Sequence, residues 1–178
     1  MSPLVFVAML LPFLVLAGCQ ENASQTGKPV AITLTEEAAG HYCQMTVLGH
    51  EGPKAQIHLE GYPAPLWFSQ VRDGIAYLKS PEKAGEVVAF YVNDMGAAKS
   101  WTEPGIDNWI DVEMAVFVVG SDARGGMGAP EIVPFADKGK AEEFARERGG
   151  TVMALADIPA EAVLGPVDHD AGQTEGSG

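Results

Sequence analysis

Three side chains that can bind soft metal ions lie in one short stretch of this sequence. The stretch reads His-Tyr-Cys-Gln-Met from His41 and contains Cys43 and Met45. If it forms a β-strand, alternate side chains face the same side, so the imidazole, thiol and thioether would lie together. A site that pairs a thiolate with a thioether selects Cu(I) and matches a tetrahedral zinc site poorly. A Cu(I) site is therefore the first hypothesis; the alternative is a buried cysteine and a gap-filling methionine on a core strand.

A third donor from elsewhere in the chain would make such a site tighter, and the other methionines are candidates. Met127 lies in a loop, residues 124–130, whose glycines and proline cannot belong to a core element. Its side chain there indicates either packing at a domain seam or a soft metal ligand, and both readings stay open. Met95, at the end of a predicted strand, is a second choice. Met114 and Met153 follow the apolar alternation of strands and are predicted to be core.

The composition favours a globular protein and excludes some partners. The chain has 178 residues, of which 47% are hydrophobic, enough for one compact unit or two small ones. Its 24 acidic and 11 basic residues give a formal net charge of −13. This charge argues against binding to nucleic acid and against electrostatic docking on anionic lipid.

The N-terminal stretch has the features of an export signal. Residues 3–18 carry no charge and are too short and too interrupted by proline to span a membrane. The sequence Leu-Ala-Gly-Cys that ends at Cys19 resembles the lipobox of bacterial lipoproteins, although no Lys or Arg follows Met1. Residues 1–18 are then a removed lipoprotein signal peptide, Cys19 is the lipidation site, and Cys43 is the sole remaining thiol. Residues 19–29 are expected to form a flexible tether.

The rest of the chain indicates an α+β fold of two similar ββαβ units. The first unit (30–95) is predicted to contain strands 41–48 and 55–60, joined by a hairpin-like connection at 49–53, an amphipathic helix 65–78 and a strand 86–94. After a linker (96–108), the second unit (109–160) is predicted to contain strands 110–120 and 131–135, a helix 138–148 capped by Asp137, and a strand 151–156. Each unit is too small to be stable alone, so we expect the two to share a core. Residues 161–178 are expected to be an acidic, disordered tail.

Several ordered motifs together resemble the NosL family over residues 33–158. Besides the lipobox, they are Cys43-Gln44-Met45, Val92-Asn93-Asp94-Met95, Trp101, Trp109-Ile110-Asp111, Val118-Val119-Gly120-Ser121, Met127-Gly128, Pro134-Phe135 and Gly149-Gly150. The resemblance implies a fold related to that of organomercury lyase. It also implies one Cu(I) held by Cys43 and Met45 with at least one further ligand, and Met127 stands where the family has a Met-Gly. The family commonly reads Cys-Gly-Met; we expect Gln44 to leave the ligands unchanged, because the middle side chain of a strand triplet faces the other way.

The resemblance implies a chaperone rather than an enzyme. A NosL-like protein would be anchored by lipid on the periplasmic side of a bacterial membrane and would deliver Cu(I) for the copper centres of nitrous oxide reductase. Its partners would be that enzyme and its maturation machinery, including an ABC transporter complex. The alternative is a cysteine enzyme with Cys43 as nucleophile and His41 as base, which would tolerate loss of the Met45 thioether. A third possibility is a structural lipoprotein in which Cys43 is inert.

Overall fold

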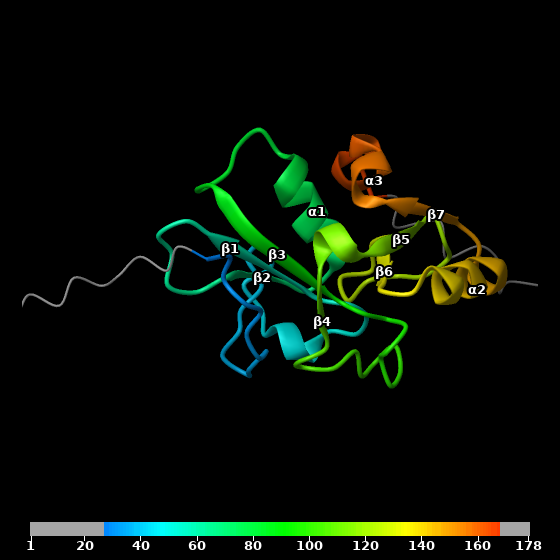
Figure 1. The fold of residues 1–178 in the computed structure, drawn as a ribbon, viewed down its shortest axis with the longest axis horizontal. Coiled ribbons are helices and arrows are strands. Elements are labelled where there is room, and N and C mark those ends of the chain that lie inside the picture. The colour runs from blue at the N-terminus through cyan, green and yellow to red at the C-terminus, as the bar shows by residue number, and fades with distance from the viewer. Residues whose placement is uncertain (1–26, 168–178) are drawn as a thin grey trace, which may run out of the picture.

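The structure is a computed structural model that describes residues 27–167. The predicted signal peptide, the lipidation site Cys19, most of the tether and most of the acidic tail lie outside the described residues. Two antiparallel sheets form the described part, with helices packed on them (Figure 1).

The first sheet has four strands in the order β2-β1-β3-β4. Its elements are β1 (Ala55–Leu59), β2 (Leu66–Phe68), α1 (Val71–Lys79), β3 (Val87–Asn93) and β4 (Trp109–Asp111). All strand pairs are antiparallel, with β1 between β2 and β3. The predicted strands 55–60 and 86–94 are therefore confirmed, because both carry enough apolar and β-branched side chains for a central strand buried on both faces.

The second sheet has three strands in the order β6-β5-β7. Its elements are β5 (Val116–Val119), β6 (Val133–Phe135), α2 (Lys138–Arg148) and β7 (Thr151–Ala154). The predicted helix 138–148 is confirmed, and Asp137 caps it by accepting a hydrogen bond from the Lys140 amide over 2.9 Å. Both sheets place the first strand of the group in the middle, so the order strand, strand, helix, strand recurs with the same arrangement.

One apolar core joins the two sheets. Ile57 and Phe90 from the first sheet lie in the same buried cluster as Phe117 from the second. The cluster also contains Val163 of a short helix, α3 (Ala160–Leu164), which packs against α1 (Figure 1). The two halves therefore bury their apolar faces together, as the small size of each half requires.

The predicted strand 41–48 is wrong. Residues 41–43 form a turn, and Val47–Gly49 is a short 3-10 helix. Gln44 has a φ of +56°, in the left-handed region that interrupts any strand. With no strand before it, the segment 49–53 is not a hairpin connection.

The predicted helix 65–78 is correct only from Val71 onward. Leu66–Phe68 forms β2 instead, with Leu66 opposite Ile57 and Phe68 opposite Ala55 on β1. An apolar stripe with helical spacing runs through this segment, but pairing with β1 offers its first three residues a better partner. Tertiary contact therefore overrides the local pattern.

The predicted long strand 110–120 is interrupted. A 3-10 helix, Val112–Met114, separates β4 in the first sheet from β5 in the second. The first sheet consequently extends beyond the predicted linker, and the second group of elements begins at β5 rather than at residue 109. Met114, predicted to be core, is 76% exposed because it lies on this 3-10 helix and not on a strand.

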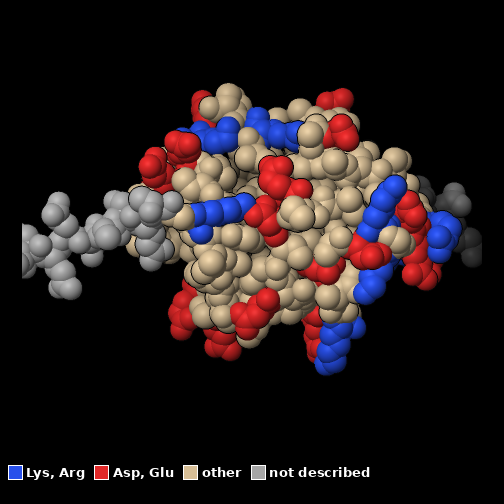
Figure 2. All heavy atoms as spheres, viewed as in Figure 1, with Lys and Arg blue, Asp and Glu red and all other residues tan. Residues whose placement is uncertain are grey.

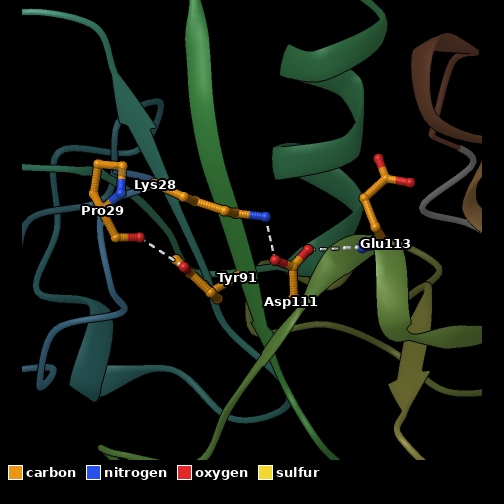
Figure 3. A network of polar contacts seen from close by, with 5 residues as sticks. All are labelled: Lys28, Pro29, Tyr91, Asp111 and Glu113. Carbon is orange, nitrogen blue, oxygen red and sulfur yellow. Dashed lines mark hydrogen bonds and ion pairs between the residues drawn. The ribbon is translucent and has the colours of Figure 1, made fainter. Parts of the chain in front are cut away.

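The predicted tail and tether are both shorter than expected. Residues 161–165 are ordered by α3 and by Arg72, whose Nη2 donates to the carbonyl oxygens of Val163 and Gly165 over 3.2 and 3.0 Å. At the other end, Lys28 pairs with Asp111 on β4, and the Tyr91 hydroxyl on β3 donates to the Pro29 carbonyl over 2.6 Å (Figure 3). Among residues 27–167, contacts with the first sheet therefore already include Lys28 and Pro29 of the predicted tether.

The surface carries acidic and basic side chains together. On the face drawn in Figure 2, neither sign forms a single continuous block. Between residues 27 and 167, the helices are all too short or too polar to cross a bilayer.

Candidate metal centre

Cys43 and Met45 lie in one closed turn. The Gly40 amide donates to the Met45 carbonyl over 2.9 Å, and the Gln44 amide donates to the Gly40 carbonyl over 2.8 Å. The left-handed backbone at Gln44 makes this turn possible. The Gln44 side chain supports it, because its amide nitrogen donates to the His41 carbonyl over 2.8 Å.

This turn changes the physical reason for the family's Cys-Gly-Met sequence. We expected Gln44 to leave the ligands unchanged because its side chain would face away on a strand; the strand is wrong, and the effect on the ligands stays a prediction. A positive φ is the conformation that glycine adopts at little cost and other residues adopt with strain. Gln44 occupies a glycine-like position and offsets part of the strain with its side-chain hydrogen bond.

The Cys43 sulfur is half-buried beside Ser69. Its Sγ lies 3.5 Å from the Ser69 Oγ, in the residue that follows β2. Gly40 makes room for both groups, since a Cβ at that position would stand 2.5 Å from the sulfur and 3.1 Å from the hydroxyl oxygen. The thiol therefore sits over a glycine against the segment that leads into α1.

The His41 side chain lies in an aromatic cluster that the predicted strand did not indicate. The imidazole packs among three aromatic rings, Tyr42, Phe68 and Tyr77, at centroid distances of 5.0, 5.6 and 5.5 Å. The His41 amide donates to the Trp67 carbonyl. The geometry thus gives His41 an aromatic environment, and its role as a ligand stays a prediction.

Met127 approaches the same region from the second half of the chain. We define the Met127 loop as residues 124–130. The Met127 amide donates to the Gln70 Oε1 over 3.0 Å, and Gln70 directly follows Ser69. Met45 and Met127 are 44% and 37% exposed, whereas Cys43 is half-buried. The Cys43 sulfur and the Met127 backbone thus contact two adjacent residues, Ser69 and Gln70, on the segment that leads into α1.

The loop comes this close because of its glycines. A Cβ at Gly126 would stand 2.4 Å from the His50 Cβ, and the Gly126 carbonyl lies 3.1 Å from the His50 Nδ1. A Cβ at Gly125 would stand 2.5 Å from the Glu131 Oε2. The Gly-Gly pair before Met127 is thus needed for close packing.

Buried ionisable groups lie behind the loop. Burial raises the pKa of Glu131 to about 8, and Asp73 adds to the effect. Burial also lowers the pKa of Lys54 to about 8, opposed by Glu131 and Glu51. Within residues 27–167, histidine, cysteine and carboxylate side chains form no group of three that could hold a metal ion. The candidate ligands Cys43, Met45 and Met127 carry sulfur atoms, which as soft donors suit Cu(I).

The remaining candidates lie elsewhere. Met95 packs against the core of the second half, and Met153 packs against the shared core. His58 is half-buried, with its Nε2 3.0 Å from the Gln56 Oε1 and its ring packed on Tyr91. Burial lowers its pKa. These residues therefore do not join the candidate site.

Sequence reasoning missed four residues that build the site. They are Gly40, Ser69, Gln70 and Glu131. Ser69 and Gln70 were assigned to the predicted helix 65–78, whereas they precede α1, which begins at Val71. The available signal was the Gly-Gly-Met-Gly sequence, which indicates a backbone that something approaches closely.

Comparison with known proteins decides the family. A family model described as NosL matches residues 30–163. The chain belongs to the NosL family. The resemblance seen in the sequence motifs is thereby confirmed, and the family match covers the turn, the Met127 loop and both sheets.

Relatives in this family are named for copper. A copper-binding lipoprotein NosL of Achromobacter cycloclastes is 52% identical over 164 residues, 92% of this chain and 84% of the relative. One of Stutzerimonas stutzeri is 32% identical, covering 85% and 77%. The crystal structure of the copper chaperone NosL from Shewanella denitrificans matches with a TM-score of 0.69 and 30% identity, covering 74% of this chain and 96% of that one. These names describe binding and carrying of a metal, not catalysis.

Proposed function

We propose that this protein is a copper chaperone that binds Cu(I) through Cys43 and Met45 and releases it by ligand exchange. The observation that carries the proposal is that the Cys43 sulfur and the Met127 loop contact two adjacent residues, Ser69 and Gln70. Cys43 and Met45 share a turn, and the Met127 loop is hydrogen-bonded to the residue that follows the cysteine's neighbour Ser69. Membership of the NosL family, whose relatives are named as copper-binding, supports the same conclusion.

The ion is cargo in this proposal, so release matters as much as capture. A half-buried thiol with exposed thioethers leaves an incoming ligand room to attack the metal. Closed sites with four protein ligands suit structural metals better. Binding also requires the thiol to lose its proton, so the affinity should rise with pH.

An anaerobic, competitive Cu(I) titration of the protein without its first 19 residues tests the proposal. We expect one tight equivalent in the wild type, loss of tight binding in Cys43→Ser, and weaker binding in Met45→Leu and in Met127→Leu. Met114→Leu is the matched control. Met114 carries the same thioether and is exposed, but it lies on the 3-10 helix between β4 and β5 and is not a candidate ligand. Equal affinity of wild type and Cys43→Ser would refute the copper site.

His41 remains the fourth candidate ligand, and a conservative change tests it. His41→Phe keeps an aromatic ring in the cluster with Phe68 and Tyr77. A weaker Cu(I) complex with unchanged unfolding would support ligation by the imidazole. Unchanged affinity would assign His41 to packing alone.

The alternative of a cysteine enzyme has less support. The hydrogen-bonding partner of the Cys43 Sγ among the described residues is the Ser69 hydroxyl, whereas the His41 imidazole packs on aromatic rings. A nucleophile needs its base within hydrogen-bond reach. The further implication of a fold related to organomercury lyase stays a prediction, and fold would not by itself imply activity.

We further propose that the recipient is nitrous oxide reductase, reached through its maturation machinery and ABC transporter complex. The support is the family resemblance. Cells that lack this protein should produce nitrous oxide reductase with too little copper, and the wild-type gene should restore the metal whereas Cys43→Ser should not. Full copper content in cells without the protein would refute this recipient.

Anchoring by lipid at Cys19, on the periplasmic side, is proposed from the lipobox and from the lipoprotein names of the relatives. Cys19→Ser should move the protein from the membrane fraction to the soluble periplasmic fraction and abolish labelling by radioactive palmitate. A labelled, membrane-bound Cys19→Ser protein would refute the assignment.

A further inference from the structure

Two buried polar side chains lie between the start of α1 and the Met127 loop and are not candidate ligands. Gln70 is 3% exposed and Glu131 is 1% exposed. Uncharged Gln70 and acidic Glu131 both occupy positions where an apolar residue would pack more cheaply. Packing alone therefore does not explain why these two polar side chains are buried.

The Gln70 amide links the loop to α1. Its oxygen accepts the hydrogen bond of the Met127 amide over 3.0 Å, and its nitrogen donates to the Asp73 Oδ2 over 2.9 Å. The two bonds fix which way the amide points. Because Ser69 contacts the Cys43 sulfur, the dipeptide Ser69-Gln70 touches the thiol on one side and the Met127 backbone on the other.

Glu131 also binds the start of α1, from the segment that follows the Met127 loop. Its Oε1 accepts hydrogen bonds from the amides of Arg72 and Ile132 over 2.9 and 2.8 Å. Its Oε2 is buried without a hydrogen-bond partner among the described residues. The first bond fastens the start of α1, which carries Gln70, to the chain segment that leaves the Met127 loop.

The unpartnered oxygen faces the loop. Glu131 Oε2 and Gln70 Oε1 lie 2.5 and 2.6 Å from the point where a Cβ of Gly125 would stand. The backbone at Gly125 therefore rests directly on two acceptor oxygens. Such a pair is best accommodated when the carboxyl carries a proton, and the groups that face it are Lys54, Asp73 and Arg72.

We propose that Gln70 and Glu131 are positioning residues that fix Met127 relative to Cys43 and so set the affinity for Cu(I) without touching the ion. This inference rests on the proposed function, with Met127 as a ligand. The physical reason is pre-organisation: a ligand held in place before binding loses less conformational freedom when the metal arrives.

A double-mutant cycle tests the proposal. Gln70→Leu and Glu131→Leu are made alone and together with Met127→Leu, and Cu(I) affinity is measured by anaerobic competition. Each single change should weaken binding about tenfold, the effect of losing one hydrogen bond. In the Met127→Leu background the same changes should have no further effect, because no ligand remains to be positioned.

A conservative variant and a copper-free measurement complete the test. Glu131→Gln keeps the shape and supplies a donor, so it should bind Cu(I) within about threefold of the wild type. In the metal-free protein, amide exchange at Met127 should be about tenfold faster in Gln70→Leu than in the wild type. If Glu131→Leu does not fold, Gln70→Leu and Glu131→Gln still decide the question.

The possible failures are distinguishable. Wild-type protein that binds no Cu(I) would overturn the proposed function. Tight wild-type binding, with equal losses in both backgrounds, would overturn the positioning role alone and make Gln70 and Glu131 ordinary contributors to stability.

Discussion

The two helices that follow a strand pair begin in different ways. At α2, the N-cap Asp137 uses its own side chain to accept from the Lys140 amide. At α1, the N-cap Gln70 makes no capping bond, and the Arg72 amide is instead served by Glu131 from the second half of the chain. The same arrangement of strands and helix therefore carries a local cap in one half and a long-range cap in the other.

The difference between the two helix starts frees the Gln70 side chain for a contact with the Met127 loop. Release from capping leaves the Gln70 amide available to bind the Met127 backbone. The helix α1 is buried along most of its length, whereas α2 buries only Ala141. The Cys43 sulfur and the Met127 backbone contact the two residues that precede the buried helix, and the Glu131 carboxyl from the other half binds its first turn.

The largest expected effect follows from removing the long-range cap. Glu131→Ala leaves the buried Arg72 amide without an acceptor and opens a cavity, so we expect a loss of about 3 kcal/mol in unfolding free energy. Urea unfolding of the metal-free protein measures it. A loss no larger than that of Asp137→Ala would show that the long-range cap contributes no more than the local one and would remove the basis of the comparison.

The second effect is a dependence of stability on pH. The pKa of Glu131 is raised in the folded state, so its stabilising contribution is full below about pH 4.5 and is lost as the pH rises to about 8. The pKa of Lys54 is lowered, so its contribution is present above about pH 10.5 and is lost as the pH falls to about 8. The two groups together predict a minimum of stability near pH 8.

Glu131→Gln provides the control for this minimum. It should remove most of the fall in unfolding free energy between about pH 4.5 and 8, since the group no longer titrates. Asp73, whose pKa burial also raises, would keep a smaller slope of the same sign. A profile identical to that of the wild type would mean that Glu131 does not hold a proton in the folded protein.

The third effect concerns the local cap. Asp137→Ala should cost about 1 kcal/mol in unfolding free energy, the usual cost of removing a capping side chain. Copper affinity should stay within about twofold, because α2 lies outside the candidate site. A tenfold weaker Cu(I) complex would contradict the assignment of metal binding to the start of α1 alone.

The smallest effect concerns the turn itself. Gln44→Gly relieves a positive φ but loses the hydrogen bond to the His41 carbonyl, so we expect a net gain of about 0.5 kcal/mol. Unchanged Cu(I) affinity would accompany it, because the turn keeps its shape. A destabilised Gln44→Gly protein would show that the side-chain bond outweighs the backbone strain.

The sequence by itself determined the elements whose signals are local. Asp137 and Gly149-Gly150 marked the ends of α2, and a run of β-branched and aromatic residues marked β3. The motifs also identified the family, with Cys43, Met45 and Met127 as candidates, because residue types and their order need no coordinates.

Only the tertiary structure decided how these residues meet. The alternation that placed His41, Cys43 and Met45 on one face assumed a strand. The structure has a turn there, because the backbone of Gln44 is left-handed. The apolar stripe of residues 65–78 is compatible with a helix throughout, but Leu66–Phe68 pair with β1 and form a strand instead. Gln70 and Glu131 gave no local signal, because their hydrogen bonds to Met127 and Arg72, 57 and 59 positions away, depend on where two distant segments pack, and no short pattern encodes that.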